Sequence, residues 1–374
     1  MGKATNVATP SSAFRESPHK KRPKTIKIRL NPGKIARTVT SRSSHQDEAS
    51  HTSRQSPLLE PVSSNWHLEY DINRLLGEGA FGKVYEARRI KDSCLVALKI
   101  INLDSVTNTA LEREMNAMRI LSNPGHEHIC SLYDQYQDNT KFIISMEHIS
   151  GIELFEHLVS KGSFSEREAS NFLCQCAEGI QYIHEKKMMH GDLKPENLMM
   201  CSNGNVKIVD FGSCASFSST PLIFGTIAYL SPEVLRTFGV PQIPRPSVDF
   251  WAFGVIMFIM LTGRHPFDAT NVASDDVIRQ NIISTLSDHD DSIFVNLEGL
   301  SMSSINLMKR LLNADPKHRI GVSEFLDDCW CQNTAPKTCL QNCEELREFN
   351  AKAKRRFKAA VSTIIAVHKL KSLR

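Results

Sequence analysis

The sequence lacks any apolar run long enough to cross a membrane. Its longest, Trp251 to Leu261 (WAFGVIMFIML), is well short of the ~20 residues that a membrane-spanning helix needs. We therefore predict that this run is a buried helix in a packed soluble core. The polar, basic N-terminus predicts no secretory signal peptide. Asn6 also stands where a myristoylation signal has Ser or Thr.

Framework-spaced cysteines and calcium-binding loops are missing as well. The ten cysteines are scattered, and Cys174 and Cys176, like Cys329 and Cys331, are too close in the chain for ordinary metal-ligand pairs. This pattern predicts free thiols in a reducing compartment. No EF-hand loop is present, so a response to calcium would need a partner protein. We find no internal repeat.

Charge is small in total but uneven along the chain. Residues 1–64 carry twelve Lys and Arg against four Asp and Glu, and residues 345–374 carry nine against two. Because the net charge of the whole chain is +4, residues 65–344 have a net charge of −11. Two basic ends around an acidic domain predict attraction within the molecule. We expect no nucleic-acid partner.

Residues 1–64 are rich in Ser, Thr, Pro and Lys, which predicts a disordered basic extension. Within it, HKKRPK (His19 to Lys24) is either a nuclear-import patch or an ordinary solvated basic run. We expect a cytoplasmic protein, and nuclear entry is the alternative that this patch leaves open.

From about Trp66 the pattern changes to short strands and then to helices. NRLLGEGAFGKVYEARRI predicts a strand, a glycine-rich turn and a second strand, and CLVALKII predicts a third. The apolar spacing in TALEREMNAMRIL predicts a helix. After Pro232 helices dominate to about Trp330, so a strand-rich half precedes a helix-rich half.

A long helix is predicted over SEREASNFLCQCAEGIQYIH. Ser165 and Glu168 have the spacing of a capping box at its start. Helical spacing assigns its inner face to Phe172, Cys176, Ile180 and Ile183.

A glycine-rich loop runs from Gly77 to Gly82. Its three glycines let backbone N–H groups approach phosphate oxygens without interference from a Cβ atom. The G-x-G-x-x-G pattern also occurs in dinucleotide-binding folds, but there a helix follows, whereas KVYEARRI predicts a strand here. We therefore favour a phosphate-binding loop between two strands.

Lys99 lies on a mostly apolar predicted strand, so its ammonium group needs an anionic partner. Glu114 and Glu112, on the next predicted helix, are the candidates. Glu114 fits better because it lies on the inward apolar stripe of that helix. The stripe consists of Leu111, Ala117, Met118 and Leu121. The pair would leave Lys99 facing phosphate oxygens.

The stretch MMHGDLKPENLMM places Asp192, Lys194 and Asn197 close together, and Asp210 follows in VDFG. Phosphoryl transfer needs in-line positioning, metal ions that bridge phosphates, and a group that accepts the hydroxyl proton. Asp192 is the candidate general base. Asn197 and Asp210 offer the hard oxygen ligands that Mg²⁺ prefers.

These motifs, in this order, resemble those of eukaryotic-type protein kinases from about Tyr70 to Trp330. SPE at 231–233, DFWAFG at 249–254 and DPKHRIG extend the match. The resemblance implies an α+β fold with two lobes: a small antiparallel β-sheet lobe with one helix (65–149) and a larger helical lobe (150–331). It implies ATP and Mg²⁺ as cofactors, protein substrates, and Ser/Thr specificity because DLKPEN contains a lysine.

The resemblance also implies roles for single residues. Asp192 would be the base, Lys194 would contact the γ-phosphate, and Lys99 with Glu114 would complete the catalytic set. Asn197 and Asp210 would hold magnesium. Val84 and Ala97 would pack on adenine, Met146 would be the gatekeeper, and the backbone of Glu147 and Ile149 would form the hinge. The implied ATP-binding residues are Leu76, Gly77, Glu78, Gly79, Ala80, Phe81, Gly82, Val84, Ala97, Lys99, Met146, Glu147, Ile149 and Glu153. Glu233 and Arg319 would form a buried ion pair.

Within the superfamily, GIELFEHL resembles the GGELF stretch of the calmodulin-dependent kinases. By that resemblance Glu153 would reach the ATP ribose or a basic substrate residue, and Glu196 would also bind a basic substrate residue. With Thr226, they are the expected substrate-binding residues. A substrate with Arg upstream of the Ser or Thr is therefore expected.

Residues 332–374 form a C-terminal tail whose second half predicts a basic amphipathic helix. Such a helix binds a membrane surface or an acidic, Met-lined groove. It resembles the autoinhibitory and calmodulin-binding segment of that group, with Phe357, Val361, Ile364 and Leu370 as anchors. We expect the tail to block substrate until calcium-loaded calmodulin removes it. A plain structural helix and a lipid or other partner are the alternatives.

Gly191, Ile227 and Ser231 depart from the family pattern, which has Arg, Pro and Ala at these positions. The arginine before the catalytic aspartate binds a phosphate on the activation loop. Gly191 cannot do so, which predicts activity without loop phosphorylation. The rival interpretation, a pseudokinase scaffold, predicts loss of Lys99, Asp192, Asn197 or Asp210, yet the sequence has all four.

Overall fold

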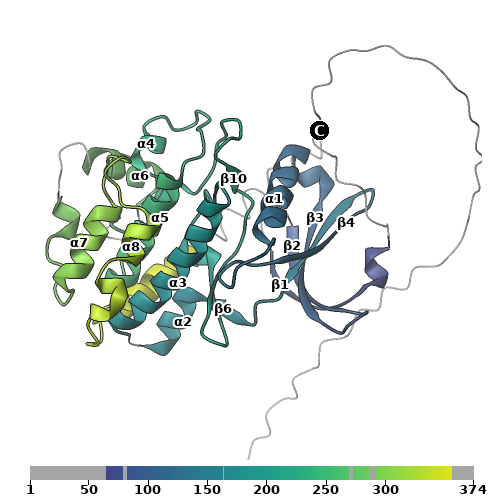
Figure 1. Ribbon diagram of the computed structural model, residues 1–374, viewed down its shortest axis with the longest axis horizontal. Helices are drawn as coiled ribbons and strands as arrows, with labels where there is room; N and C mark the ends of the chain where they lie inside the picture. Colours follow the sequence, from purple (N-terminus) through teal and green to yellow (C-terminus); the bar gives the residue numbers. More distant parts are fainter. Residues whose placement is uncertain (1–64, 79–81, 163, 269–272, 286–290, 356–374) are drawn as a thin grey trace, which may run out of the picture. The chain divides into compact units, whose positions relative to one another are not determined.

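The computed structural model describes residues 65–78, 82–162, 164–268, 273–285 and 291–355. The first part is an antiparallel sheet in the order β1-β2-β3-β5-β4, with one helix, α1 (Figure 1). The bounds are β1 Tyr70–Glu78, β2 Gly82–Arg89, β3 Leu95–Asn102, α1 Asn108–Leu121, β4 Leu132–Gln137 and β5 Lys141–Glu147.

Alternation along β3 explains how this sheet has two different faces. Val96 and Leu98 are fully buried in a small core with Trp66 and Tyr70. Because side chains alternate along a strand, Ala97 and Lys99 lie on the opposite face. The sheet therefore presents Lys99 on the face opposite this small core.

The second part is mostly helical (Figure 1). It supplies most of the large core, to which α1, β3 and β5 of the first part also contribute. Its helices are α2 Leu154–Lys161, α3 Glu166–Glu185, α4 Pro232–Leu235, α5 Pro246–Thr262, α6 Asp275–Thr285, α7 Met302–Leu311 and α8 Val322–Leu326. Strands β6 Gly151–Glu153, β8 Leu198–Cys201 and β9 Val206–Ile208 form one small sheet, and β7 Met188–Met189 pairs with β10 Ala215–Ser216. The predicted bilobal α+β fold is confirmed.

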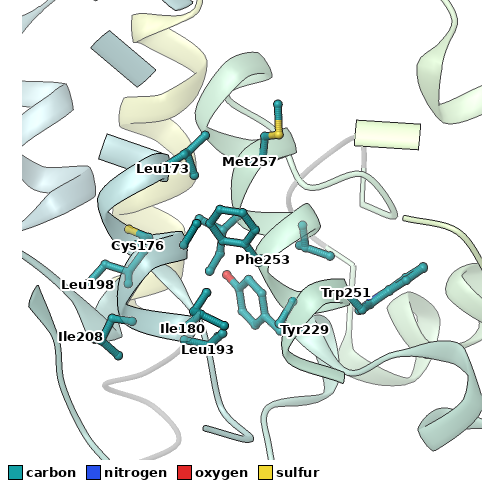
Figure 2. Packing of buried hydrophobic residues seen from close by; sticks show 14 of the residues in the cluster. Leu173, Cys176, Ile180, Leu193, Leu198, Ile208, Tyr229, Trp251, Phe253 and Met257 are labelled. Atoms are coloured by element: carbon teal, nitrogen blue, oxygen red, sulfur yellow. The ribbon is translucent and has the colours of Figure 1, made fainter. Parts of the chain in front are cut away.

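Helix α5 is the centre of the large core, as its apolar sequence predicts. Every residue from Trp251 to Leu261 is buried. Figure 2 shows Phe253 and Met257 of α5 in the same cluster as side chains of α3. In the part of the chain that the structure describes, no helix combines the length and apolarity needed to span a membrane.

The predicted inner face of α3 was wrong at one position. The Ser165–Glu168 capping box is present. Cys176, Ile180 and Ile183 are buried as expected, but Leu173 is fully buried while Phe172 is only half-buried. The buried stripe of α3 runs through Ala169, Leu173, Cys176, Ile180 and Ile183, so the helical period places Leu173 inward and Phe172 one position to the side. There the ring of Phe172 meets His157 of α2 edge-on at 6.1 Å.

Residues 335–355 pack on the large lobe. Leu340 N–H donates to the carbonyl of Phe164 (2.7 Å), and residues 343–355 are helical. Leu346 is fully buried, and the ring of Phe349 lies 6.3 Å from that of Phe155 on α2. The first half of the segment assigned to the tail is therefore part of the core of this lobe.

Candidate active site

Lys99 of β3 and Glu114 of α1 form the ion pair that connects the sheet to its helix. Nζ of Lys99 lies 2.5 Å from Oε1 of Glu114, whereas the alternative partner, Glu112, is exposed. Burial disfavours the charged form of Lys99, but Glu114 and Asp210 outweigh it and raise its pKa. Lys99 therefore stays positively charged.

The sheet places the expected adenine-pocket residues on one face. Val84 of β2 lies opposite Lys99, and Ala97 lies opposite Met146 of β5. Directly opposed residues of antiparallel strands share a face, so these four side chains line the same surface. Glu147 follows Met146, and its carboxylate already pairs with Lys207 (2.9 Å). Leu76, Gly77, Glu78, Gly82, Ile149 and Glu153 are described, whereas Gly79, Ala80 and Phe81 lie outside the described residues.

Asp249, in the first turn of α5, holds the catalytic loop, the stretch MMHGDLKPENLMM at residues 188–200, in place. Its carboxylate accepts the backbone N–H groups of His190 (2.8 Å) and Gly191 (2.9 Å), and it also contacts His184 Nε2 at 2.8 Å. The sequence interpretation gave Asp249 no role. An acid at the start of an otherwise apolar helix was the available signal, because a buried carboxylate needs partners.

Gly191 adopts a left-handed backbone conformation, φ +79°, which glycine takes without steric cost. A Cβ atom here would lie 2.8 Å from the carbonyl oxygen of Ser213. Gly225 lies in the activation segment, which runs from Asp210 to Glu233. It approaches the catalytic loop equally closely, because a Cβ atom on Gly225 would lie 2.8 Å from the carbonyl oxygen of Gly191. The activation segment thus lies directly against the backbone of the catalytic loop.

Asp192 lies at the centre of a short hydrogen-bond network. Lys194 Nζ donates to Asp192 Oδ2 (2.7 Å), and the Thr226 hydroxyl donates to Asp192 Oδ1 (2.7 Å). Burial opposes the charge on Lys194, yet Asp192 raises the pKa of this lysine above its ordinary value. The carboxylate of Asp192 therefore already accepts a hydrogen bond from one hydroxyl group, that of Thr226.

Asn197 and Asp210 fit a magnesium site. Asn197 Nδ2 donates to the backbone oxygen of Asp192 (2.9 Å), which leaves its amide oxygen as the group that can bind a metal ion. Asp210 has φ +64°, an uncommon conformation for a non-glycine residue. Burial alone would raise the pKa of Asp210, but Lys99 and Lys194 hold it below its ordinary value. A carboxylate and an amide oxygen are ligands suited to Mg²⁺.

Three glutamates form an acidic surface beside the catalytic loop. Glu196 is largely buried, its Oε2 has no hydrogen-bond partner within the described residues, and burial raises its pKa. Glu153 and Glu156 bind Lys354, whose Nζ lies 3.4 Å and 2.8 Å from their carboxylates. Glu156 and Lys354 were not predicted; only the i, i+3 spacing of the two glutamates in GIELFEHL hinted at the pair.

In the large lobe, Arg319 and Glu233 form the expected ion pair. Arg319 donates two hydrogen bonds to the Glu233 carboxylate (2.8 and 2.9 Å) and others to the carbonyls of Ser247 and Asn313. The Arg319 side chain is fully buried. The four expected calmodulin-binding residues, Phe357, Val361, Ile364 and Leu370, lie outside the described residues.

Comparison with known sequences agrees with this geometry. The family model for the protein kinase domain matches residues 70–331. The chain belongs to the protein kinase family. ATP and Mg²⁺ are the cofactors of that family. The kinase fold explains why Lys99, Asp192 and Asp210, which are far apart in the sequence, meet at one site.

Individual kinases give the same family. A carbon catabolite-derepressing protein kinase of Candida glabrata is 34% identical over 294 residues, covering 76% of this chain and 45% of that protein. An Aurora kinase of Dictyostelium discoideum is 32% identical, covering 72% and 68%. CBL-interacting serine/threonine-protein kinase 20 of Arabidopsis thaliana is 32% identical, covering 71% and 58%. The chain thus spans between 45% and 68% of the length of these relatives. None of the three is named for calmodulin.

Proposed function

We propose that this kinase transfers the γ-phosphate of ATP to Ser and Thr hydroxyls of proteins. The observation that carries the proposal is the Asp192 carboxylate bound by Lys194 and by the hydroxyl of Thr226. It shows that a hydroxyl fits against Asp192 at hydrogen-bond distance, which a general base requires. The rival proposal, a pseudokinase scaffold, would require a missing catalytic group, and Lys99, Asn197 and Asp210 are also present.

In the proposed reaction the substrate hydroxyl gives its proton to Asp192 while its oxygen bonds to the γ-phosphorus. The bond from the γ-phosphorus to the bridging oxygen of ADP breaks, and ADP leaves. Lys99, held by Glu114, would bind phosphate oxygens, and Lys194 would stabilise the transferred group. When bound, Mg²⁺ on Asn197 and Asp210 would neutralise phosphate charge.

We infer that the substrate carries a basic residue upstream of the Ser or Thr. Oε2 of Glu196 is buried and has no hydrogen-bond partner among the residues that the structure describes, so a cation would satisfy it. Glu153 and Glu156 already bind an ammonium group of the chain itself. An arginine suits such a site well because its planar guanidinium can donate to two carboxylates.

Lys354 is then an internal competitor for the substrate. Its side chain is 42% exposed, and an exposed ion pair contributes at most about 1 kcal/mol. Leu346 and Phe349 are buried, and each such side chain is worth about 1.5–3 kcal/mol. The segment up to Phe349 is therefore firmly packed, and of the described residues only 350–355, with Lys354, are held weakly enough to be released.

Replacing Lys354 by Glu should lower the KM for a peptide with an upstream Arg by about two- to fivefold, since the lost ion pair is exposed. The kcat should stay the same. Lys352→Glu is the matched control, because Lys352 is an equally basic residue of the same helix and pairs with Glu348 at 3.5 Å. Steady-state kinetics check both variants. Equal KM values for wild type and Lys354→Glu would exclude Lys354 as a competitor.

We propose calmodulin as the partner that removes the segment carrying Lys354 from Glu153 and Glu156. Two features support this: the basic amphipathic pattern of residues 345–374, and the likeness of GIELF to the corresponding stretch of calmodulin-dependent kinases. Adding calcium-loaded calmodulin to the full-length chain should then lower the peptide KM as Lys354→Glu does. Calmodulin without calcium is the control. No change in KM or activity with calcium present would remove calmodulin from the account.

Finally, we propose that activity does not require a phosphorylated activation segment. Gly191 offers no side chain to bind a phosphate. The segment is held instead by the close approach of Gly225 to the Gly191 carbonyl and by the hydrogen bond from the Thr226 hydroxyl to Asp192. The combined change Ser218→Ala, Ser219→Ala and Thr220→Ala should keep at least about half of the activity, because only local hydrogen bonds such as Ser219 Oγ to the Ser216 carbonyl are lost. Peptide phosphorylation rates check this, and a loss above tenfold would refute it.

A further inference from the structure

Cys174 and Cys331 face each other across two elements of the large lobe, although 157 positions separate them in the sequence. Cys174 lies on α3, and Cys331 lies in the π-helical turn η6, Trp330–Thr334. Each thiol is the neighbour with the largest effect on the pKa of the other, so the two side chains lie within interaction range. The sequence pattern compared only neighbouring cysteines and therefore did not indicate this pair.

The backbone around both thiols is held in place by packing. The Ser170 hydroxyl donates to the carbonyl of Trp330 (3.1 Å) and lies 3.9 Å from Cys174 Sγ, so one side chain connects α3 to the residue before Cys331. Trp330 is fully buried, and its indole N–H donates to Glu166 (2.7 Å). These contacts hold α3 and η6 together beside the two cysteines.

This pair also differs from the buried cysteines in exposure and in pKa. Cys174 and Cys331 are half-buried, whereas Cys130, Cys176 and Cys214 are buried. The interaction with Cys331 lowers the pKa of Cys174, and the interaction with Cys174 raises that of Cys331. By contrast, burial raises the pKa of Cys130 to about 12 and also raises those of Cys176 and Cys214. A thiolate is the reactive form, so Cys174 is the expected nucleophile.

We propose that Cys174 and Cys331 form a redox modification site that closes to a disulfide on reaction with a peroxide. The Cys174 thiolate attacks one oxygen of hydrogen peroxide, forming a sulfenic acid and releasing hydroxide. The Cys331 thiol then attacks that sulfur, the S–S bond forms and water leaves. Each sulfur loses one electron and the peroxide gains two. A dithiol reductant reverses the change.

The test treats the full-length chain with hydrogen peroxide, blocks remaining thiols by alkylation and maps the peptides by mass spectrometry without reduction. We expect a Cys174–Cys331 cross-linked peptide that disappears after dithiothreitol. The melting temperature of the oxidised chain should rise by about 5–10 °C, because a disulfide closing a long loop is strongly stabilising. If Cys331 instead pairs with the exposed Cys329, or both thiols are alkylated after peroxide, the proposal is overturned.

Two substitutions keep this test decisive if peroxide also damages other groups. In Cys331→Ser the sulfenic acid on Cys174 has no partner, so a dimedone adduct should accumulate there and not in wild type. Cys329→Ser is the matched control and should form the same cross-link as wild type. A dimedone adduct of equal amount in wild type and Cys331→Ser, or loss of the cross-link in Cys329→Ser, would contradict the assignment.

Discussion

Replacing Asp192 by Asn should lower the rate of phosphate transfer about 100- to 10,000-fold, the usual effect of removing a positioned base. Asparagine has nearly the same shape and can still accept from Lys194 or Thr226, but its amide takes up no proton. ATP affinity should stay the same, because the groups assigned to ATP binding are elsewhere. Transfer of radiolabel from ATP to a peptide, and nucleotide binding by calorimetry, measure the two quantities.

Asp92→Asn is the matched control for this experiment. Asp92 binds Arg89 on the surface of the sheet, so the same change of charge occurs far from Lys194 and Thr226. Its rate should equal that of the wild type. Equal incorporation of label by wild type and Asp192→Asn would defeat the enzyme interpretation and favour a scaffold.

Replacing Arg319 by Met should lower the free energy of unfolding by about 3–5 kcal/mol, because it breaks a buried ion pair by removing one partner. Glu233 would lose both hydrogen bonds from the guanidinium, and the carbonyls of Ser247 and Asn313 would lose theirs. Trp251 would also lose the cation that lies 5.1 Å from its ring centre. Urea denaturation followed by tryptophan fluorescence measures the change.

Arg310→Met is the control for the second prediction. Arg310 also pairs with a carboxylate, Asp328 at 2.9 Å, but its side chain is 44% exposed. Exposed pairs contribute about 0–1 kcal/mol, so this variant should unfold almost as the wild type does. If Arg319→Met costs no more than Arg310→Met, the pair below the active site has no structural role.

The sequence predicted what local pattern determines. The buried helix around Trp251 follows from an uninterrupted apolar run, and the capping box of α3 follows from the spacing of Ser165 and Glu168. The choice of Glu114 as the partner of Lys99 follows from the apolar stripe of α1. The two-lobe architecture was implied by the resemblance to protein kinases.

What the sequence did not predict depends on contacts between distant segments. Asp249 fixes the catalytic loop only because α5 passes beneath it, and no periodicity within α5 indicates this. Lys354 meets Glu153 and Glu156 across about 200 positions, and Cys174 lies near Cys331 across 157 positions. Phe172 was misplaced for a local reason, because Leu173 is the residue that continues the buried stripe of α3.

The most direct test is the initial rate at which the phosphatase-treated full-length chain transfers labelled γ-phosphate from ATP and Mg²⁺ to a peptide with Arg upstream of Ser. Because the exposed ion pair of Lys354 with Glu156 is weak, the substrate can displace Lys354, and the full-length chain should have measurable basal activity. The account predicts labelled phosphoserine, at a rate at least about 100-fold above that of Asp192→Asn. No labelled phosphoserine, or the same rate from both proteins, would contradict it.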